Sequence, residues 1–162
     1  MAPMSSACIV SDPAEYGVAK QTPPFLDATA AAPSVLHRKD VASNQTFQVT
    51  VPFRSEDVGD EIVAQLFLDY NTDGEFLLRF EQVPPGKFEE QRTIDIPSVS
   101  LSNTIVDPGC YVMTLVVTHR SNLNAENRPV DPQDTSILTW IINFDDDGEN
   151  RVNGCPKAGG VN

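Results

Sequence analysis

The sequence predicts an all-β protein: an antiparallel β-sandwich of about seven strands behind a disordered N-terminal tether. Three observations favour this fold. Short apolar or alternating segments recur at roughly ten-residue spacing, with turn signals between them. The chain contains 13 Pro and 9 Gly, which favour many turns. Its 40% apolar and 21% charged residues are typical of a globular protein with a core.

One segment, 107–121, is the part around which the rest of the sheet is predicted to form. A turn at 107–109 leads directly into a run of apolar and β-branched residues, Tyr111–Thr118. A strand that is apolar on both faces belongs in the middle of a sheet. We therefore predict a central strand here, with Cys110 at its start.

The chain divides into three predicted parts. Residues 1–33 are rich in Pro and Ala and have no sustained hydrophobic period, which is typical of a tether. Residues 34–145 form the predicted sandwich domain. Residues 146–162 are an acidic, then glycine-containing C-terminal tail.

The first half of the sandwich is predicted to hold three strands. The segment Ser34–Lys39 is expected to be an edge strand protected by its charges. In Phe47–Phe53 apolar residues alternate, and Pro52 is expected to end the strand or place it at a sheet edge. For 55–70 we predict a loop and then a strand over Glu61–Asp69, with a helix as the alternative.

The second half is predicted to contain four strands: the second strand of a hairpin, the strand that follows it, the central strand and the last strand. Asp73-Gly74 is expected to supply the positive-φ residues of a hairpin turn that leads into Glu75–Val83. A strand over Arg92–Val99 is broken by Pro97. The last strand, Ser136–Phe144, is predicted to lie beside the central strand and to carry Trp140 in the core.

The start of the central strand resembles a known family. Pro108-Gly109-Cys110-Tyr111, followed by Leu115 and Val117, is similar to strand F of immunoglobulin-like and fibronectin-like domains. Tether, sandwich and cysteine-flanked final hairpin together look like surface lipoproteins of delta-proteobacteria. The resemblance implies an immunoglobulin-like sandwich over Ser34–Phe144 and brings no catalytic chemistry with it.

The cysteines favour an oxidising compartment. Cys110 and Cys155 are predicted to form a disulfide that pins the C-terminal tail, with a stabilisation of roughly 3–4 kcal/mol. Two separate thiols are the alternative. Cys8 is left over and is expected to have a separate role.

The segment around Cys8 resembles the end of a bacterial lipoprotein signal, because the small residues Ser5, Ser6 and Ala7 precede the cysteine. Ser5 replaces the usual Leu, and 1–7 has neither a positive nor an apolar signal region. Either the protein stays in the cytoplasm or the chain is a processed or trimmed form. Because the cysteines favour an oxidising compartment, we expect export to the periplasm or cell surface as an outer-membrane lipoprotein. A stray thiol at Cys8 is the alternative.

The acidic balance of the chain limits its partners. With 11 basic and 23 acidic residues, the formal net charge is −12. This charge repels phosphate backbones and anionic lipid headgroups. We expect no nucleic-acid partner and membrane contact only through a lipid anchor.

The predicted recognition surface is the long loop Asn122–Asp134, because sandwich domains place their contacts on long loops at one end. The loop is rich in Asn, Pro and acidic residues. We expect it to bind a protein partner in an envelope assembly. The residues predicted to take part are His119, Arg120, Asn122, Asn124, Asn127 and Arg128.

Two acidic segments bear a weak likeness to calcium sites. Asp69, Asn71 and Asp73 fit the first half of a calcium loop, but the glutamate that should complete it is out of register. Asp145 and Asp147 form a second cluster in the tail. A hairpin turn and a solvated tail explain these residues, so no cofactor is predicted. A calcium-dependent adhesive or carbohydrate-binding domain is the alternative.

The sequence predicts no catalysis. It has two histidines, and it contains neither a G-x-S-x-G nor an H-E-x-x-H motif. A hydrolase with an acidic active site is a further alternative, since many carboxylates offer pairs. The predicted function is a non-catalytic structural or protein-binding module of the bacterial cell envelope.

Overall fold

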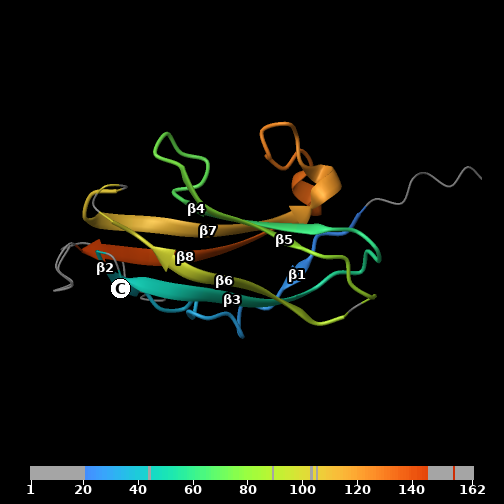
Figure 1. Cartoon of the computed structure of the whole chain (residues 1–162), viewed down its shortest axis with the longest axis horizontal. Coiled ribbons are helices and arrows are strands. Elements are labelled where there is room, and N and C mark those ends of the chain that lie inside the picture. The colour runs from blue at the N-terminus through green and yellow to red at the C-terminus, as the bar shows by residue number, and fades with distance from the viewer. Residues whose placement is uncertain are drawn as a thin grey trace, which may run out of the picture.

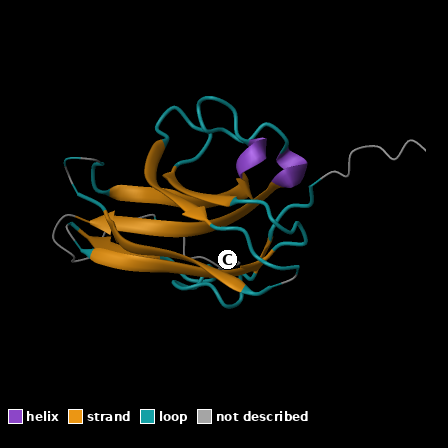
Figure 2. Cartoon of the chain, turned by 45° about the vertical axis from the view of Figure 1, so that its right-hand side comes forward, coloured by secondary structure: helices purple, strands orange, loops and turns teal. Residues whose placement is uncertain are grey.

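The structure, a computed structural model, describes residues 21–43, 45–88, 90–102, 104, 106–145 and 155. The described elements are strands and two short 3-10 helices (Figures 1 and 2). The strands are β1 (Phe25–Leu26), β2 (Lys39–Ala42), β3 (Thr46–Arg54), β4 (Ile62–Leu68), β5 (Phe76–Val83), β6 (Arg92–Ser100), β7 (Gly109–His119) and β8 (Thr135–Asp145). The helices are η1 (Arg120–Asn122) and η2 (Pro132–Asp134), both between β7 and β8.

The strands form two layers, which Figure 1 shows nearly edge-on. One sheet has the order β1-β3-β6 and the other β2-β8-β7-β4-β5. All pairings are antiparallel except that of β2 with β8. The predicted all-β sandwich is confirmed. The structure also confirms the central position of the strand predicted in 107–121, which is β7. The last strand, β8, lies beside it, as predicted.

The topology is that of an immunoglobulin-like domain. Strands β1, β3 and β6 correspond to A, B and E of that fold, and β8, β7, β4 and β5 correspond to G, F, C and C′. At the start of β7 the Tyr111 hydroxyl donates to the Asp107 carbonyl at 2.5 Å. This contact is the tyrosine corner that such domains form at the start of strand F. The resemblance of 108–117 to strand F therefore extends to three-dimensional structure.

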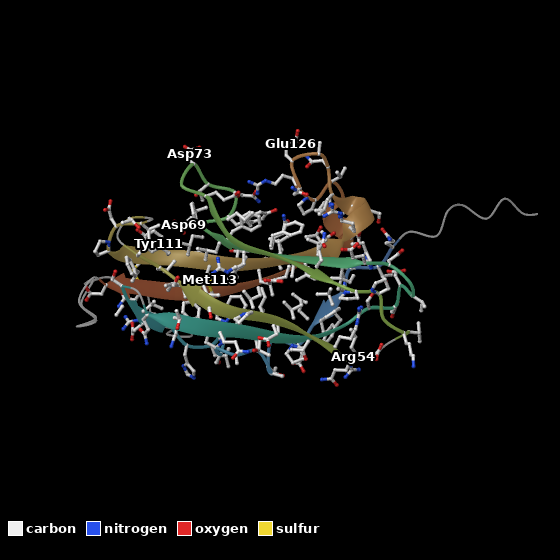
Figure 3. All side chains as sticks on the ribbon, viewed as in Figure 1. Arg54, Asp69, Asp73, Tyr111, Met113 and Glu126 are labelled. Carbon is white, nitrogen blue, oxygen red and sulfur yellow. A yellow bond between two sulfur atoms is a disulfide. The ribbon has the colours of Figure 1, made fainter. Side chains whose placement is uncertain are left out.

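The core lies between the two sheets, where alternate residues of facing strands meet. Trp140, Phe53, Phe144 and Met113 are at most 1% exposed, and Figure 3 shows Met113 directed between the layers. Burying a side chain of this size stabilises the fold by roughly 1.5–3 kcal/mol. The Trp140 indole also donates to the Pro33 carbonyl at 2.7 Å, so its polar atom is satisfied.

The described part of the predicted tether packs against the sandwich. β1 pairs with β3, and Ala32 forms an isolated bridge with Thr50. Ala31 is buried in the core cluster. The sandwich therefore takes in residues well before Ser34, the start that the sequence predicted. Residues 1–20, and with them the predicted lipid site Cys8, lie outside the described residues.

Two proline positions differ from the prediction. Pro52 does not place β3 at an edge, because β3 lies between β1 and β6, and the Pro52 carbonyl accepts a hydrogen bond from Asp27 N at 2.9 Å. Pro97 does not break β6. The β3–β6 register shifts opposite Pro97 and Ser98, where Ser98 has φ +57°, so a bulge accommodates the proline.

Three local predictions near the N-terminal half need correction. The alternative helix over 55–70 is wrong, because β4 occupies Ile62–Leu68. The segment Ser34–Lys39 is mostly turn, since the Ser34 hydroxyl accepts a hydrogen bond from Leu36 N and β2 begins at its last residue. In the β4–β5 turn the positive φ values fall on Asp69 (+48°) and Asn71 (+61°), and not on Asp73-Gly74.

The disulfide between Cys110 and Cys155 is confirmed, with the two Cα atoms 5.4 Å apart. It joins the start of β7 to the predicted tail, and Cys155 is 7% exposed. A structural disulfide indicates an oxidising, extracytoplasmic environment. Among the described residues no helix has the length and apolar character needed to cross a bilayer.

Candidate functional site

Two loops from opposite ends of the five-stranded sheet cover its outer face. One is the β4–β5 turn, residues 69–75, and the other is the β7–β8 loop, residues 120–134. Because β4 and β7 are antiparallel neighbours, these connections leave the sheet at its two ends. Both loops rise from the same side of the molecule (Figure 1). The candidate site is formed where they approach one another.

Asn122 organises the base of the β7–β8 loop. Its side-chain amide donates to Thr118 Oγ1 and to the Asp131 carbonyl, both at 2.8 Å. Its side-chain oxygen accepts from Asp131 N at 2.7 Å, and its main-chain carbonyl accepts from Val130 N at 2.9 Å. Asn122 is 8% exposed, so these bonds are protected from water. One buried side chain therefore closes the loop.

His119 fixes the same base from the core side. Its Nδ1 lies 2.5 Å from Asp134 Oδ1, and its Nε2 lies 3.4 Å from Ser55 Oγ and 3.6 Å from Asp57 Oδ2. Burial raises the pKa of Asp134 above its usual value, although the hydrogen bond and charge of His119 act to lower it. The histidine thus ties the loop to the segment that follows β3.

The tip of the loop is a compact turn organised by Asn124. Its side-chain oxygen accepts hydrogen bonds from Glu126 N at 3.0 Å and Arg128 N at 2.8 Å. Asn127 has φ +58°, a left-handed conformation that asparagine tolerates. Its main-chain carbonyl accepts from the buried Gln65 amide at 2.8 Å. The tip is therefore attached to the sheet beneath it.

Arg128 connects the two loops. Its guanidinium forms an ion pair with Glu75 of the β4–β5 turn and lies over the Phe67 and Tyr70 rings, 5.1 and 5.9 Å from their centroids. Burial acts to raise the pKa of Glu75, but the bonds from Arg128 and Asn71 N outweigh it, so the pKa lies below its usual value. The two loops are thus joined by charge and by stacking.

The two loops enclose a cleft of about 270 Å³, which we call the outer-face cleft. Its floor comes from the sheet and its walls from the two loops. Leu77 on the floor is 44% exposed, whereas Phe67 is 2% exposed beneath Arg128. The lining residues are Gln65, Phe67, Glu75, Leu77, Glu126, Asn127 and Arg128.

The structure divides the six predicted binding residues into two groups. His119 and Asn122 are buried at the base of the loop and hold it in place. Arg120 is exposed and its guanidinium lies 5.9 Å from the centroid of the Phe80 ring. Asn127 and Arg128 line the outer-face cleft, and Asn124 shapes the turn that presents them.

Sequence reasoning missed the sheet side of the cleft. Gln65 is a polar residue inside an apolar strand, and this is the signal that could have marked it. Glu75 and Leu77 had no signal, because their contact with the loop depends on how the loop folds back. Gln65 is 1% exposed, and its Oε1 has no hydrogen-bond partner among the described residues.

The side chains of Ser55, His119 and Asp134 are connected as in the Ser-His-Asp triad of serine hydrolases, with the distances given above. Their surroundings fit a structural role. Ser55 is 4% exposed and His119 is fully buried, so protein atoms cover the hydroxyl and the imidazole. The Ser55 hydroxyl also accepts a hydrogen bond from Asp57 N at 3.2 Å. This group holds the base of the loop.

The acidic turn is occupied by protein contacts. Asp69 Oδ1 accepts from Val112 N at 2.9 Å, and Glu75 Oε2 accepts from Asn71 N at 2.8 Å. Asp73 lies at the tip of the turn (Figure 3). Within the described ranges, no group of three His, Cys, Asp or Glu side chains could hold a metal ion. Of the second cluster, Asp147 lies outside the described residues.

Neither a protein-family model nor a curated protein sequence matches the chain. Solved structures show a distant likeness in fold. The CARDB domain of the PF1109 protein from Pyrococcus furiosus has a TM-score of 0.40 and 12% identity over 76% of this chain and 86% of that one. A superoxide reductase (neelaredoxin) from Ignicoccus hospitalis has a TM-score of 0.38 and 11% identity over 77% and 82%. The PapD-like domain of human CEP192 has a TM-score of 0.31 and 9% identity over 89% and 97%. These likenesses concern the arrangement of strands and carry no argument about function.

Proposed function

We propose that this chain is a non-catalytic protein-binding module of the bacterial cell envelope. In this proposal it is exported, anchored as an outer-membrane lipoprotein through Cys8, and serves as an accessory subunit of a larger assembly. The outer-face cleft carries the protein-binding part of the proposal. A buried network fixes the β7–β8 loop at its base, while the tip of the loop stays exposed.

A rigid base and an exposed tip suit recognition, because a loop that is already ordered loses little conformational entropy on binding. Bonds from Asn122 and His119 order the loop before any partner arrives. The acidic surface adds to this, since a formal net charge of −12 speeds association with basic partners and excludes acidic ones.

The envelope part of the proposal has two supports. The Cys110–Cys155 disulfide indicates an oxidising compartment. The Ser5-Ser6-Ala7-Cys8 segment has the small residues that a lipoprotein signal places before its cysteine. A lipid chain on Cys8 would hold the sandwich near a membrane and raise its local concentration around membrane-bound partners.

The test uses the protein in its own cells. A photo-activated cross-linking residue is placed at Asn127, which lines the outer-face cleft, and as a control at Leu36, which is 67% exposed and does not line it. We expect a discrete cross-linked envelope protein from position 127 and none from position 36. Intact mass of the same protein reports diacylglyceryl addition at Cys8. A soluble protein without the lipid, and without a cross-link at either position, contradicts the proposal.

A further inference from the structure

We propose that the outer-face cleft recognises a cationic side chain, lysine or arginine, presented by the protein partner. This inference rests on the proposed protein-binding function and specifies the chemical group of the partner that the cleft binds. Three properties of the cleft support it. The rim has a negative charge, one buried acceptor atom lacks a hydrogen-bond donor, and the floor is apolar and can contact an aliphatic side-chain stem.

The rim of the cleft is negative. Its lining contains two carboxylates, Glu75 of the β4–β5 turn and Glu126 of the loop tip. Arg128 is the cation among these groups, and its charge is already matched by Glu75. Asp73 and Glu126 lie at the tips of the two loops on the same side of the molecule (Figure 3). A positive group that enters between the loops therefore meets the unmatched carboxylate of Glu126.

Glu126 is the carboxylate best placed to meet such a group. It lines the cleft and is exposed, and within the described part of the chain no ion pair involves it. Its backbone is held in the turn, because its main-chain N–H donates to Asn124 Oδ1. An unpaired carboxylate on an ordered turn at the edge of a cleft offers a charge-assisted hydrogen bond to a lysine or arginine head.

Gln65 supplies an independent observation that points to a donor. Its side chain forms part of the cleft, its amide nitrogen is used by the Asn127 carbonyl, and its oxygen is left without a partner among the described residues. A buried acceptor without a donor is unfavourable. Ammonium and guanidinium groups carry donors and no acceptors, so they complement this oxygen as well as the acidic rim.

The size and floor of the cleft fit one long side chain. About 270 Å³ is below the range of pockets that hold drug-sized ligands. Leu77, which is 44% exposed, provides apolar surface against which the methylene stem of lysine or arginine can pack. The Phe67 ring is covered by the Arg128 guanidinium, so Leu77 is the apolar part of the floor that an incoming stem can reach.

The direct test is an NMR titration of the disulfide-bonded protein with three capped tripeptides, acetyl-Gly-Arg-Gly-amide and its Gln and Glu counterparts. We expect saturable shifts at the Gln65 side-chain amide and at the Glu126 and Asn127 main-chain amides with the Arg peptide. Equal shifts with the neutral or acidic peptide, or no shift with any peptide, would overturn the inference.

Three variants refine the test. Glu126→Gln removes the charge from an exposed position without disturbing the fold, and we expect a severalfold weaker response to the Arg peptide. Gln65→Met fills the same space but removes the acceptor together with the amide that holds the Asn127 carbonyl. We expect a loss of response similar to that of Glu126→Gln, after the spectrum has shown that the loop tip keeps its fold. Glu56→Gln is the matched control, because Glu56 is an exposed carboxylate that does not line the cleft. A response to the Arg peptide that Glu126→Gln leaves unchanged also overturns the inference.

The titration and the in-cell cross-link can fail separately. A cross-link at position 127 without a response to the Arg peptide supports the protein-binding function and contradicts the recognition of a cationic side chain. A cross-link that persists at full yield in Glu126→Gln does the same. A response to the Arg peptide that Glu126→Gln weakens supports this recognition even where the lipid at Cys8 is absent.

Discussion

Arg128 in the β7–β8 loop and Glu75 in the β4–β5 turn form an ion pair that joins two loops from opposite ends of the same sheet. The pair lies on the outer face of that sheet, above Phe67. In sandwich domains, recognition loops extend from the ends of the sheets. Here the β7–β8 loop folds back instead, and the ion pair is part of what holds it there.

Removing the ion pair should loosen the loop tip while the sandwich stays folded. For Arg128→Gln we expect a loss of about 1 kcal/mol in the free energy of unfolding, because the side chain loses a partly exposed ion pair and a cation–π contact. Hydrogen exchange should accelerate in residues 123–130. Arg128→Lys should keep part of the ion pair but little of the stacking. A double-mutant cycle with Glu75→Gln measures the coupling, and additive effects of the two changes would contradict the pairing.

The stability of the protein should depend on pH through Asp134. Burial raises the pKa of Asp134 in the folded state above its ordinary value of 3.8, so the folded state holds this proton more tightly than the unfolded state. The contribution of the group to stability is therefore full below pH 3.8 and is lost as pH rises through the folded-state pKa. Urea unfolding across this range should show a fall in wild-type stability relative to Asp134→Asn. Parallel pH profiles for the two proteins would contradict the raised pKa.

Loss of the disulfide should be strongly destabilising. The bond closes a sequence separation of 45 residues, for which loop entropy gives about 4 kcal/mol. We expect the Cys110→Ser, Cys155→Ser double variant to unfold at a clearly lower urea concentration than the oxidised wild type, and the wild type to approach it under reductant. Cys8→Ser is the control, because its cysteine is outside this bond. If reductant does not change the urea concentration at which half of the wild-type protein is unfolded, the disulfide has no structural role.

The tyrosine corner can be tested with Tyr111→Phe. The substitution removes the hydrogen bond from the Tyr111 hydroxyl to the Asp107 carbonyl, for which we expect a loss of about 1 kcal/mol at neutral pH. Burial, with the nearby Asp107 and Asp69 charges, raises the pKa of Tyr111 above 10.0. The wild type should therefore lose its advantage over Tyr111→Phe as pH rises above 10.0 toward the folded-state pKa. Chemical unfolding at neutral and alkaline pH measures both effects, and an advantage that grows with pH is the contrary result.

The sequence by itself determined the class of fold and most of its strands. Residues 47–53 alternate with the period of a strand that has one buried face, and the apolar run in 111–118 fits a strand that is buried on both faces. Segment 136–144 is the last strand of the same sheet. The pairing of Cys110 with Cys155 also followed from the predicted neighbouring strands. The inclusion of Phe25–Leu26 did not follow, because two residues carry no period.

Tertiary structure alone decided which residues form the candidate site. Arg128 is far from Gln65 and Glu75 in the sequence, and it meets them because the β7–β8 loop turns back over the sheet. Nothing local encodes that direction. It results from bonds between distant groups, such as His119 with Ser55 and the Gln65 amide with the Asn127 carbonyl. Polar contacts of this kind have no period in the sequence, so their partners become visible only after the chain has folded.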